Sequence, residues 1–194
     1  MADHIRDEDW DGRELVDVTY ERTVFSDVDM TDSRTERATF TECSFRKVRF
    51  NASTHRGSAF VNCTFSQCTF FDTTFTDCKV IGSTFERCRF TTLTVTGGDW
   101  SFVGLAGADL RGSSFSEVRL READLTGMRG EGAHFRDVDL SGATLQSADL
   151  TGADLRGSDL SSIHPFTVKL LNAKMGWQQA VQIAQALGID VVPE

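Results

Sequence analysis

The dominant feature of this chain is an apolar residue at every fifth position. From Leu15 to Leu160, the positions divisible by five hold 30 residues, and only Thr35, His55 and Gly130 are neither apolar nor aromatic. The position two residues before each of these centres is usually small or slim. A period of five fits neither the 3.6-residue repeat of a helix nor the two-residue repeat of a strand. The pattern therefore indicates a chain that turns a corner in every unit and stacks its units as a solenoid.

The units themselves resemble a known family. "ADLTG", "ADLRG" and "CTFSQ" resemble the pentapeptide-repeat proteins, whose pattern is A(D/N)LXX, and the resemblance covers residues 13–162. It implies an all-β solenoid, a right-handed quadrilateral β-helix with four pentapeptides per coil. At about 4.8 Å per coil, the 30 units correspond to roughly 7.5 coils and a rod about 36 Å long.

Both ends of the chain depart from the repeat. Residues 1–12 precede its clear part and are expected to form an N-terminal cap. Residues 163–194 are interpreted as a last coil, a capping helix and a dimerisation module. In this segment the i, i+3, i+4, i+7 spacing predicts an amphipathic helix whose apolar side covers the open end of the solenoid. That side consists of Trp177, Ala180, Val181, Ala184 and Leu187.

More apolar residues follow this helix than a cap requires. Two-fold pairing through the C-terminal module would cover two solenoid ends at once, and the family resemblance implies the same dimer. The expected dimer contacts are Trp177, Val181, Ala184, Leu187, Ile189 and Val191.

Several units of the repeat are irregular. The centres change from mostly Phe to mostly Leu near residues 94–100, which predicts a change of coil shape. His55 introduces a polar ring into the apolar column, and Gly130 is expected to leave a central position empty. Phe71 and Phe102 stand at outward positions and are candidate contact points.

The charge changes the functional picture. The net charge is −9 and the pI about 4.9, which argues against direct binding of nucleic acid and is compatible with a basic partner. The negative charge is unevenly distributed along the chain. Residues 1–33 carry 11 acidic and 3 basic residues, residues 34–98 carry 5 acidic and 9 basic, and residues 99–160 carry 11 acidic and 6 basic.

Acidic residues align when the chain is divided into coils of four pentapeptides. One corner gathers Asp77, Asp99, Glu117, Asp137, Asp139 and Asp159, interrupted by Lys79 and Arg119. On other faces the acidic surface is extended by Asp109, Asp124, Asp149 and Asp154. Carboxylates repeated about every 4.8 Å crudely resemble duplex phosphates, which are about 3.4 Å apart along a strand. On charge alone, the simpler interpretation is a solvated acidic surface that keeps a repeat protein soluble.

The sequence provides no catalytic or metal-binding constellation. All five cysteines occupy the small inward position with gaps that are multiples of five, which favours free buried thiols over zinc ligands. The four histidines are scattered, and no G-x-S-x-G, HExxH or P-loop motif occurs, so we expect no enzyme and no cofactor. The chain has no apolar run long enough to span a membrane and no signal peptide, so a cytoplasmic protein without membrane contact is expected.

Three stretches resemble one group within the family. "TERATFTECSF", "HRGSAFVNCTF" and "QQAVQIAQALG" are similar to the fluoroquinolone-resistance proteins, the mycobacterial MfpA and plasmid-borne Qnr group. The unbroken phase favours the MfpA side of that group, because Qnr proteins usually carry loops between coils. The resemblance implies a DNA-mimicking rod that binds DNA gyrase, competes with DNA and protects against fluoroquinolones. The alternative is a cytoplasmic scaffold with a partner other than gyrase.

Overall fold

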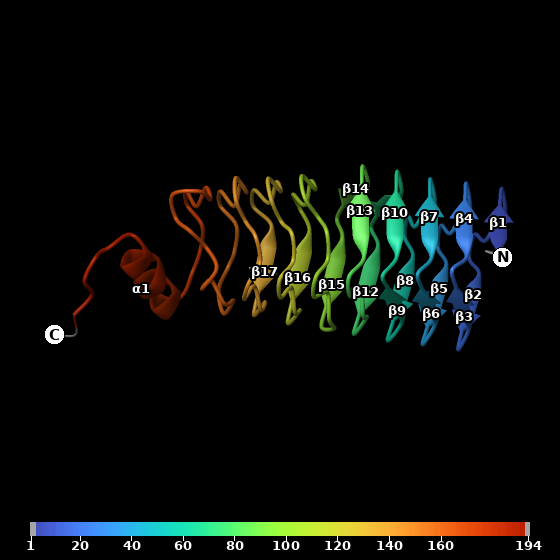
Figure 1. The fold of residues 1–194 in the computed structure, drawn as a ribbon, viewed down its shortest axis with the longest axis horizontal. Coiled ribbons are helices and arrows are strands. Elements are labelled where there is room, and N and C mark those ends of the chain that lie inside the picture. The colour runs from blue at the N-terminus through green and yellow to red at the C-terminus, as the bar shows by residue number, and fades with distance from the viewer. Residues whose placement is uncertain (1–2, 193–194) are drawn as a thin grey trace.

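The chain forms a rod with one helix at its C-terminal end (Figure 1). This computed structural model describes residues 3–192, so residues 1–2 and 193–194 of the predicted end segments lie outside the described residues. Strands of successive coils pair in parallel and in register, as in Phe25↔Phe45 and Phe45↔Phe65. This register gives four pentapeptides per coil. The predicted all-β solenoid is therefore confirmed, with about seven turns.

The strands form four sides of the rod, which we name after their first strands. The β1 side contains β1 (His4–Arg6), β4 (Val24–Ser26), β7 (Ser44–Arg46), β10 (Thr64–Ser66) and β13 (Thr84–Glu86). The β11 side contains β11 (Thr69–Phe71) and β14 (Arg89–Thr91). The β2 side contains β2 (Glu14–Val16), β5 (Arg34–Glu36), β8 (Thr54–Arg56), β12 (Thr74–Thr76), β15 (Thr94–Thr96), β16 (Ser114–Ser116) and β17 (His134–Arg136). The β3 side contains β3 (Thr19–Glu21), β6 (Thr39–Thr41) and β9 (Ala59–Val61).

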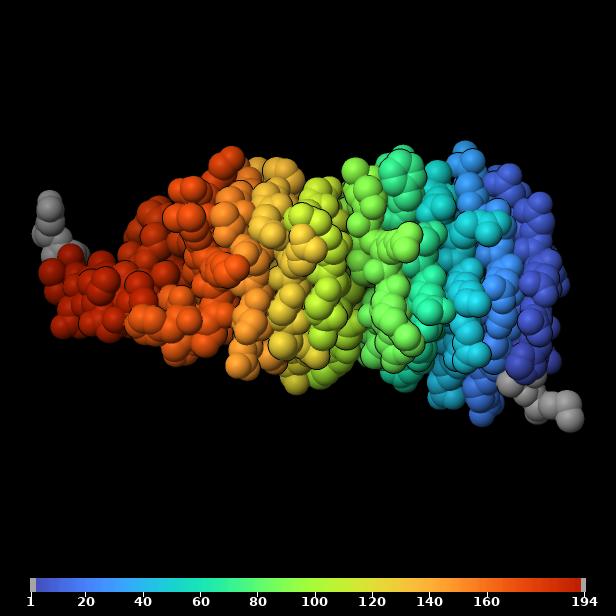
Figure 2. Space-filling model, turned by 90° about the horizontal axis from the view of Figure 1, so that it is seen from above, coloured from blue at the N-terminus to red at the C-terminus, as the bar shows by residue number. Residues whose placement is uncertain are grey.

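Around one coil the chain passes the β1, β11, β2 and β3 sides in that order, so the β11 and β3 sides are opposite. Figure 2 shows the successive coils as bands that lie next to one another along the rod. The first coil begins at His4, because β1 pairs in register with β4 inside the segment predicted as a cap.

Each corner of the coil is made by a residue in the left-handed backbone region. Every residue whose number ends in 2 or 7, from Asp7 to Gly157, has φ between +50° and +80°. Glycine adopts this conformation without steric cost, and Asp and Asn tolerate it better than most residues. The Gly, Asp and Asn residues in the outward part of the repeat are therefore explained by the corners.

The core is a set of stacked columns. Phe25, Phe45, Phe65 and Phe85 stack with nearly parallel rings whose centroids are 4.6–4.8 Å apart. This separation matches the distance between neighbouring strands, so the ring column and the backbone ladder share one repeat. Each stacked pair adds about 0.5–1.5 kcal/mol beyond the burial of its area.

The small residue two positions before each centre also points inward, and in several units it donates hydrogen bonds to the preceding coil. The Cys63 thiol donates to the carbonyl of Phe40 at 3.3 Å, and the Ser83 hydroxyl donates to that of Phe60 at 2.9 Å. All five cysteines are free, and burial raises the pKa of the Cys78 thiol to about 11. The cysteines thus act as small buried donors in the same way as the serines at equivalent positions.

Beyond Trp100 the coils change character. Only β16 and β17 remain as strands, and turns replace the other sides, as the change of centres predicts. The expected void at Gly130 does not exist. A Cβ at this position would lie 3.1 Å from Leu150 and 3.5 Å from the terminal carbon of Met128. Met128 occupies the normally small position of the same unit and fills the space that a central side chain would take.

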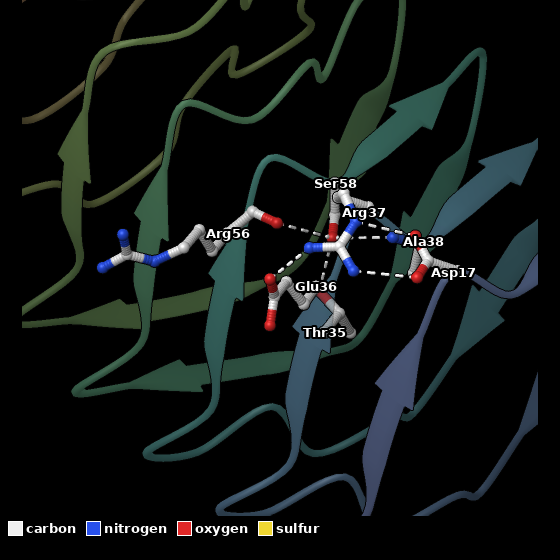
Figure 3. Close-up of polar contacts among 7 residues, drawn as sticks. All are labelled: Asp17, Thr35, Glu36, Arg37, Ala38, Arg56 and Ser58. Carbon is white, nitrogen blue, oxygen red and sulfur yellow. Dashed lines mark hydrogen bonds and ion pairs between the residues drawn. The ribbon is translucent and has the colours of Figure 1, made fainter.

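His55 is held in the core as part of a polar layer. Its Nδ1 lies 2.9 Å from the Thr35 hydroxyl and its Nε2 lies 3.0 Å from the Ser53 hydroxyl. Thr35 also bonds the hydroxyl of Ser58, which lies 3.2 Å from the carbonyl of Arg56 (Figure 3). A neutral imidazole satisfies this layer, and burial lowers the pKa of His55 to about 3.

We expect His55 to make the rod sensitive to acid. Its pKa is about 3 in the folded state and near 6.5 in an unfolded chain, so this contribution to stability is present above pH 6.5 and is lost as the pH falls. The loss is about 1.4 kcal/mol per pH unit, or roughly 2 kcal/mol at pH 5. The variant His55→Phe should lose less stability than the wild type between pH 7 and pH 5 in chemical denaturation. A matched variant at exposed His134, His134→Gln, should behave as the wild type, and equal acid losses in all three proteins would contradict the role of His55.

The C-terminal helix α1 (Trp177–Ala186) covers the last coil, but not with the predicted residues. Gln179 is buried, and its amide nitrogen donates to the carbonyls of Leu155 and Ser158 at 2.7 and 2.8 Å. Trp177 and Leu187, which the apolar spacing assigns to the covered side, are exposed. Ala180 is exposed as well, so the prediction of the capping side is wrong for these three residues. The reason is that the open coil end presents carbonyl groups that need a polar donor. Within residues 3–192, no helix is long and apolar enough to span a membrane.

Candidate functional site

Most of the predicted acidic residues form a local hydrogen bond with the backbone. In seven of them, which directly precede a central residue, a side-chain oxygen accepts the backbone N–H two residues later at 2.9–3.3 Å. These seven residues are Asp99, Asp109, Asp124, Asp139, Asp149, Asp154 and Asp159. Such a contact stabilises a turn. The Asp of the "ADL" unit is therefore explained by the fold before any function is invoked.

The other three predicted acids are corner residues. Asp77, Glu117 and Asp137 have φ of +52°, +56° and +55° and occupy one column, at the corner between the β2 and β3 sides. The next coils carry Gly97 beside Asp77 and Gly157 beside Asp137, where a Cβ would collide with the carboxylate. Glycine in these neighbours therefore leaves room for the acidic side chains to lie along the corner.

Ion pairs neutralise half of the predicted set. Asp99 pairs with Arg119, Asp109 with Arg111 and Arg129, Asp139 with Arg121, Asp149 with Lys169, and Asp154 with Arg156 and Arg136. The Lys169 ammonium lowers the pKa of Asp149 to about 2, and the Arg156 guanidinium lowers that of Asp154 further. These carboxylates present little net charge to a partner.

Four uncompensated carboxylates remain along a single corner. Within residues 3–192, no cationic side chain lies within 4.0 Å of Asp77, Glu117, Asp137 or Asp159. We call these four residues the carboxylate edge. Asp124 is also without such a partner in the described part of the chain, but it lies on the β1 side.

The same corner is neutral nearer the N-terminus. Arg37 donates to both carboxylate oxygens of Asp17, at 2.7 and 2.8 Å, and also contacts Glu36 (Figure 3). Asp17, Arg37 and Asp77 belong to one column, with Gly57 between the last two. The carboxylate edge therefore begins at Asp77, and its other three residues lie in the C-terminal half of the rod.

The predicted dimer contacts divide into two groups. Trp177, Leu187, Ile189 and Val191 are exposed, with Trp177 at 77 %, whereas Val181 and Ala184 are half-buried. The apolar helix residue that packs against the core is Ile183, which was not predicted. Val192, which continues the apolar residues after the helix, is exposed too, and two further exposed apolar side chains at this end were not predicted, namely Phe166 and Leu171. Phe166 could have been found from Pro165, which replaces a central residue and ends the regular repeat.

The acidic, histidine and cysteine side chains of the described residues do not gather into a metal site. No group of three or more His, Cys, Asp or Glu side chains within residues 3–192 is arranged to hold a metal ion. A hollow of about 400 Å³ beside the helix is lined by Gly157, Asp159, Trp177 and Gln182. It is open to solvent and contains no titratable pair.

Comparisons with known proteins agree with this architecture. Residues 101–128 and 131–161 match the family model for pentapeptide repeats, with eight copies. The solved structure of a trypsin-treated form of QnrB1, a plasmid-mediated fluoroquinolone resistance protein, is similar with 19 % identity, 99 % coverage of each chain and a TM-score of 0.61. HetL, a pentapeptide repeat protein involved in heterocyst differentiation regulation from the cyanobacterium Nostoc, is similar with 18 % identity, 88 % coverage of this chain and 84 % of that one, and a TM-score of 0.31.

Comparison with curated proteins gives no significant match. The likeness to QnrB1 is a likeness of fold, since its identity is only 19 %. The parallel register between coils and the likeness to QnrB1 show a β-solenoid fold, and residues 101–128 and 131–161 of this solenoid match pentapeptide repeats.

Proposed function

We propose that this protein is a DNA mimic of the Qnr and MfpA kind, which binds DNA gyrase, inhibits it by competing with DNA and protects against fluoroquinolones. The observation that carries this proposal is the carboxylate edge. It places four uncompensated negative charges along one corner of a straight rod. The likeness in fold to a fluoroquinolone resistance protein supports it.

The solenoid holds the backbone of the charged corner residues in place before a partner binds. Glu117 and Asp137 belong to corners one coil apart, and the backbone N–H of each corner residue donates to a carbonyl of the next coil, at 3.0 Å for Glu117 and 3.1 Å for Asp137. The backbone that carries these carboxylates therefore loses little conformational entropy on binding. A basic groove that accepts DNA would attract the edge by electrostatic steering, and salt would weaken the attraction.

The proposed active form is a homodimer joined through the C-terminal module. The exposed apolar residues Trp177, Leu187, Ile189 and Val191 lie at the helix end of the rod, where a second copy would cover them. Two rods joined at this end would roughly double the length available to a DNA-binding groove.

The test is a gyrase supercoiling assay at two salt concentrations with a charge-neutralised variant. We replace the whole carboxylate edge in the variant Asp77→Asn, Glu117→Gln, Asp137→Asn and Asp159→Asn. Asn tolerates the left-handed corners and retains the turn contact of residue 159. At about 0.5 kcal/mol per contact, the half-inhibitory concentration should rise roughly 30-fold.

The control removes the same charge from the diagonally opposite corner. Asp9, Asp29, Asp109 and Asp149 all accept turn N–H groups, so substitution of these four by Asn preserves the turns. This control should inhibit gyrase nearly as the wild type does. Equal losses in both variants would show that net charge, rather than the edge, determines inhibition.

A second candidate function follows from the turn contacts. Because seven of the ten predicted acids are explained by the fold, the protein is alternatively a scaffold whose partner is not gyrase. A folded wild-type protein that leaves gyrase unaffected at low salt would favour this second candidate.

A further inference from the structure

Phe102 differs in residue type from every other corner of the rod. Its φ is +60°, and it is the sole aromatic residue among the corners from Asp7 to Gly157. Neighbouring corners of its column hold Gly82 and Glu122. A bulky side chain is disfavoured in the left-handed region, and such outliers concentrate where binding requires them. The fold therefore does not explain the choice of phenylalanine.

The ring is presented to solvent beside a shallow groove. Phe102 is 55 % exposed, and the corner of the preceding coil is Gly82, against which the Asn62 side chain lies. The groove is lined by Asp99, Ser101, Phe102, Arg119, Arg121 and Glu122. Arg119 and Arg121 pair with Asp99 and Asp139.

The position of Phe102 relates it to the carboxylate edge. Phe102 ends the unit centred on Trp100, at the border of the β3 side. Asp159 lies at the other border of the same side, three coils further along. Half-buried Val61 and Ile81 precede Ser101 in one column of this side, so apolar surface continues from Phe102 toward the N-terminus. One partner could contact the ring and the edge together.

We infer that Phe102 is an apolar anchor that inserts into a recess of the protein partner whose basic groove receives the carboxylate edge. This inference rests on the proposed function and adds a determinant of specificity. Repeated carboxylates alone fit any groove that accepts DNA, but the phosphate backbone of DNA has no counterpart of a protruding phenyl ring. Aromatic side chains surrounded by polar groups are typical binding hot spots, and an anchor of this kind selects one partner among several basic proteins.

Phe71 provides a matched control. It is the same residue type with nearly the same exposure, 56 %. It belongs to β11, on the opposite side of the rod, and is not a left-handed corner. Its column continues with Asn51 and Thr91, so Phe71→Thr suits the local structure.

The test compares Phe102→Asn and Phe71→Thr in the gyrase supercoiling assay and in thermal unfolding. Asn is well tolerated at a left-handed corner, so Phe102→Asn should raise the Tm by about 2 °C. Its half-inhibitory concentration should rise about 30-fold, the effect of removing a hot-spot aromatic. The loss should persist at high salt, where charges are screened. Phe71→Thr should stay within about twofold of the wild type, a small fraction of a hot-spot effect.

The outcomes separate the two proposals. A wild-type protein without effect on gyrase would overturn the proposed function and the anchor with it. An inhibitory wild type whose potency Phe102→Asn leaves unchanged would overturn the anchor alone. A lower Tm in Phe102→Asn would also overturn it, because Phe102 would then serve the fold. Phe102→Leu, which restores an apolar side chain, should recover part of the inhibition.

Discussion

Replacement of Gly98 by alanine is expected to destabilise the rod by about 4 kcal/mol, through backbone strain and steric overlap together. Gly98 has φ of +88°, and a Cβ there would lie 2.8 Å from the backbone nitrogen of Cys78 and closer still to its carbonyl oxygen. The strained backbone contributes about 1–3 kcal/mol, and the overlap with a neighbouring coil contributes a similar amount. The Cys78 carbonyl cannot move away cheaply, because it accepts the N–H of Asp99 at 2.9 Å.

A second glycine separates strain from collision. Gly112 has φ of +73°, and a Cβ there would meet nothing within 4 Å. Gly112→Ala should therefore lose only about 1 kcal/mol from backbone strain. Urea unfolding of both variants measures the difference between their losses of stability, and this difference is the cost of the steric overlap with Cys78. If Gly98→Ala were no less stable than Gly112→Ala, the coil contact at the junction of the Phe and Leu halves would be unimportant.

The double variant Ile189→Glu and Val191→Glu should dissociate the proposed homodimer. Both residues are exposed in the single chain, at 54 % and 42 %, as are Trp177 and Leu187 at the two ends of the helix. A dimer that covers them would have to bury two unpaired carboxylates per chain, which costs several kcal/mol. The dissociation constant should rise at least about a thousandfold.

Light scattering coupled to gel filtration measures this change as a halving of the mass at micromolar concentration. Phe71→Glu places one charge on an equally exposed apolar residue of the rod and should leave the mass unchanged. Circular dichroism of the double variant should match the wild type, since neither substituted residue belongs to a strand or to α1. A wild-type protein that is already monomeric at this concentration would refute the proposed dimer.

The period of five predicts which acidic residues share a corner, but not which of them lack a cationic partner. Asp137 and Asp139 are two residues apart and belong to the same predicted corner, yet Arg121 pairs with Asp139 and leaves Asp137 uncompensated. This difference depends on side-chain reach between coils, which a one-dimensional pattern does not contain. The turn contact of Asp139 could have been predicted, because Asp favours bonding to an N–H two residues later.

The C-terminal helix shows a second limit of periodicity. Its apolar spacing predicts Trp177 on the covered side, but the carbonyls of Leu155 and Ser158 at the coil end require a donor, and Gln179 provides it. Buried backbone groups must be satisfied. Hydrophobic periodicity does not indicate where a side chain must donate a hydrogen bond to such groups. The existence and approximate limits of the helix were predictable, whereas the side that faces the rod was not.

The unbroken register has a consequence for how such a rod can change in length. Removal of four consecutive pentapeptides would delete one whole coil and leave every remaining side chain on its own side, since each residue pairs with its counterpart in the next coil. Removal of a single pentapeptide would preserve the inward pattern equally well, yet it would rotate everything beyond the deletion by a quarter turn. If the deletion fell between Phe102 and Glu117, Phe102 and the last three residues of the carboxylate edge would then face different directions. Loss or gain of whole coils therefore conserves the arrangement of surface residues, whereas loss or gain of a single pentapeptide changes it.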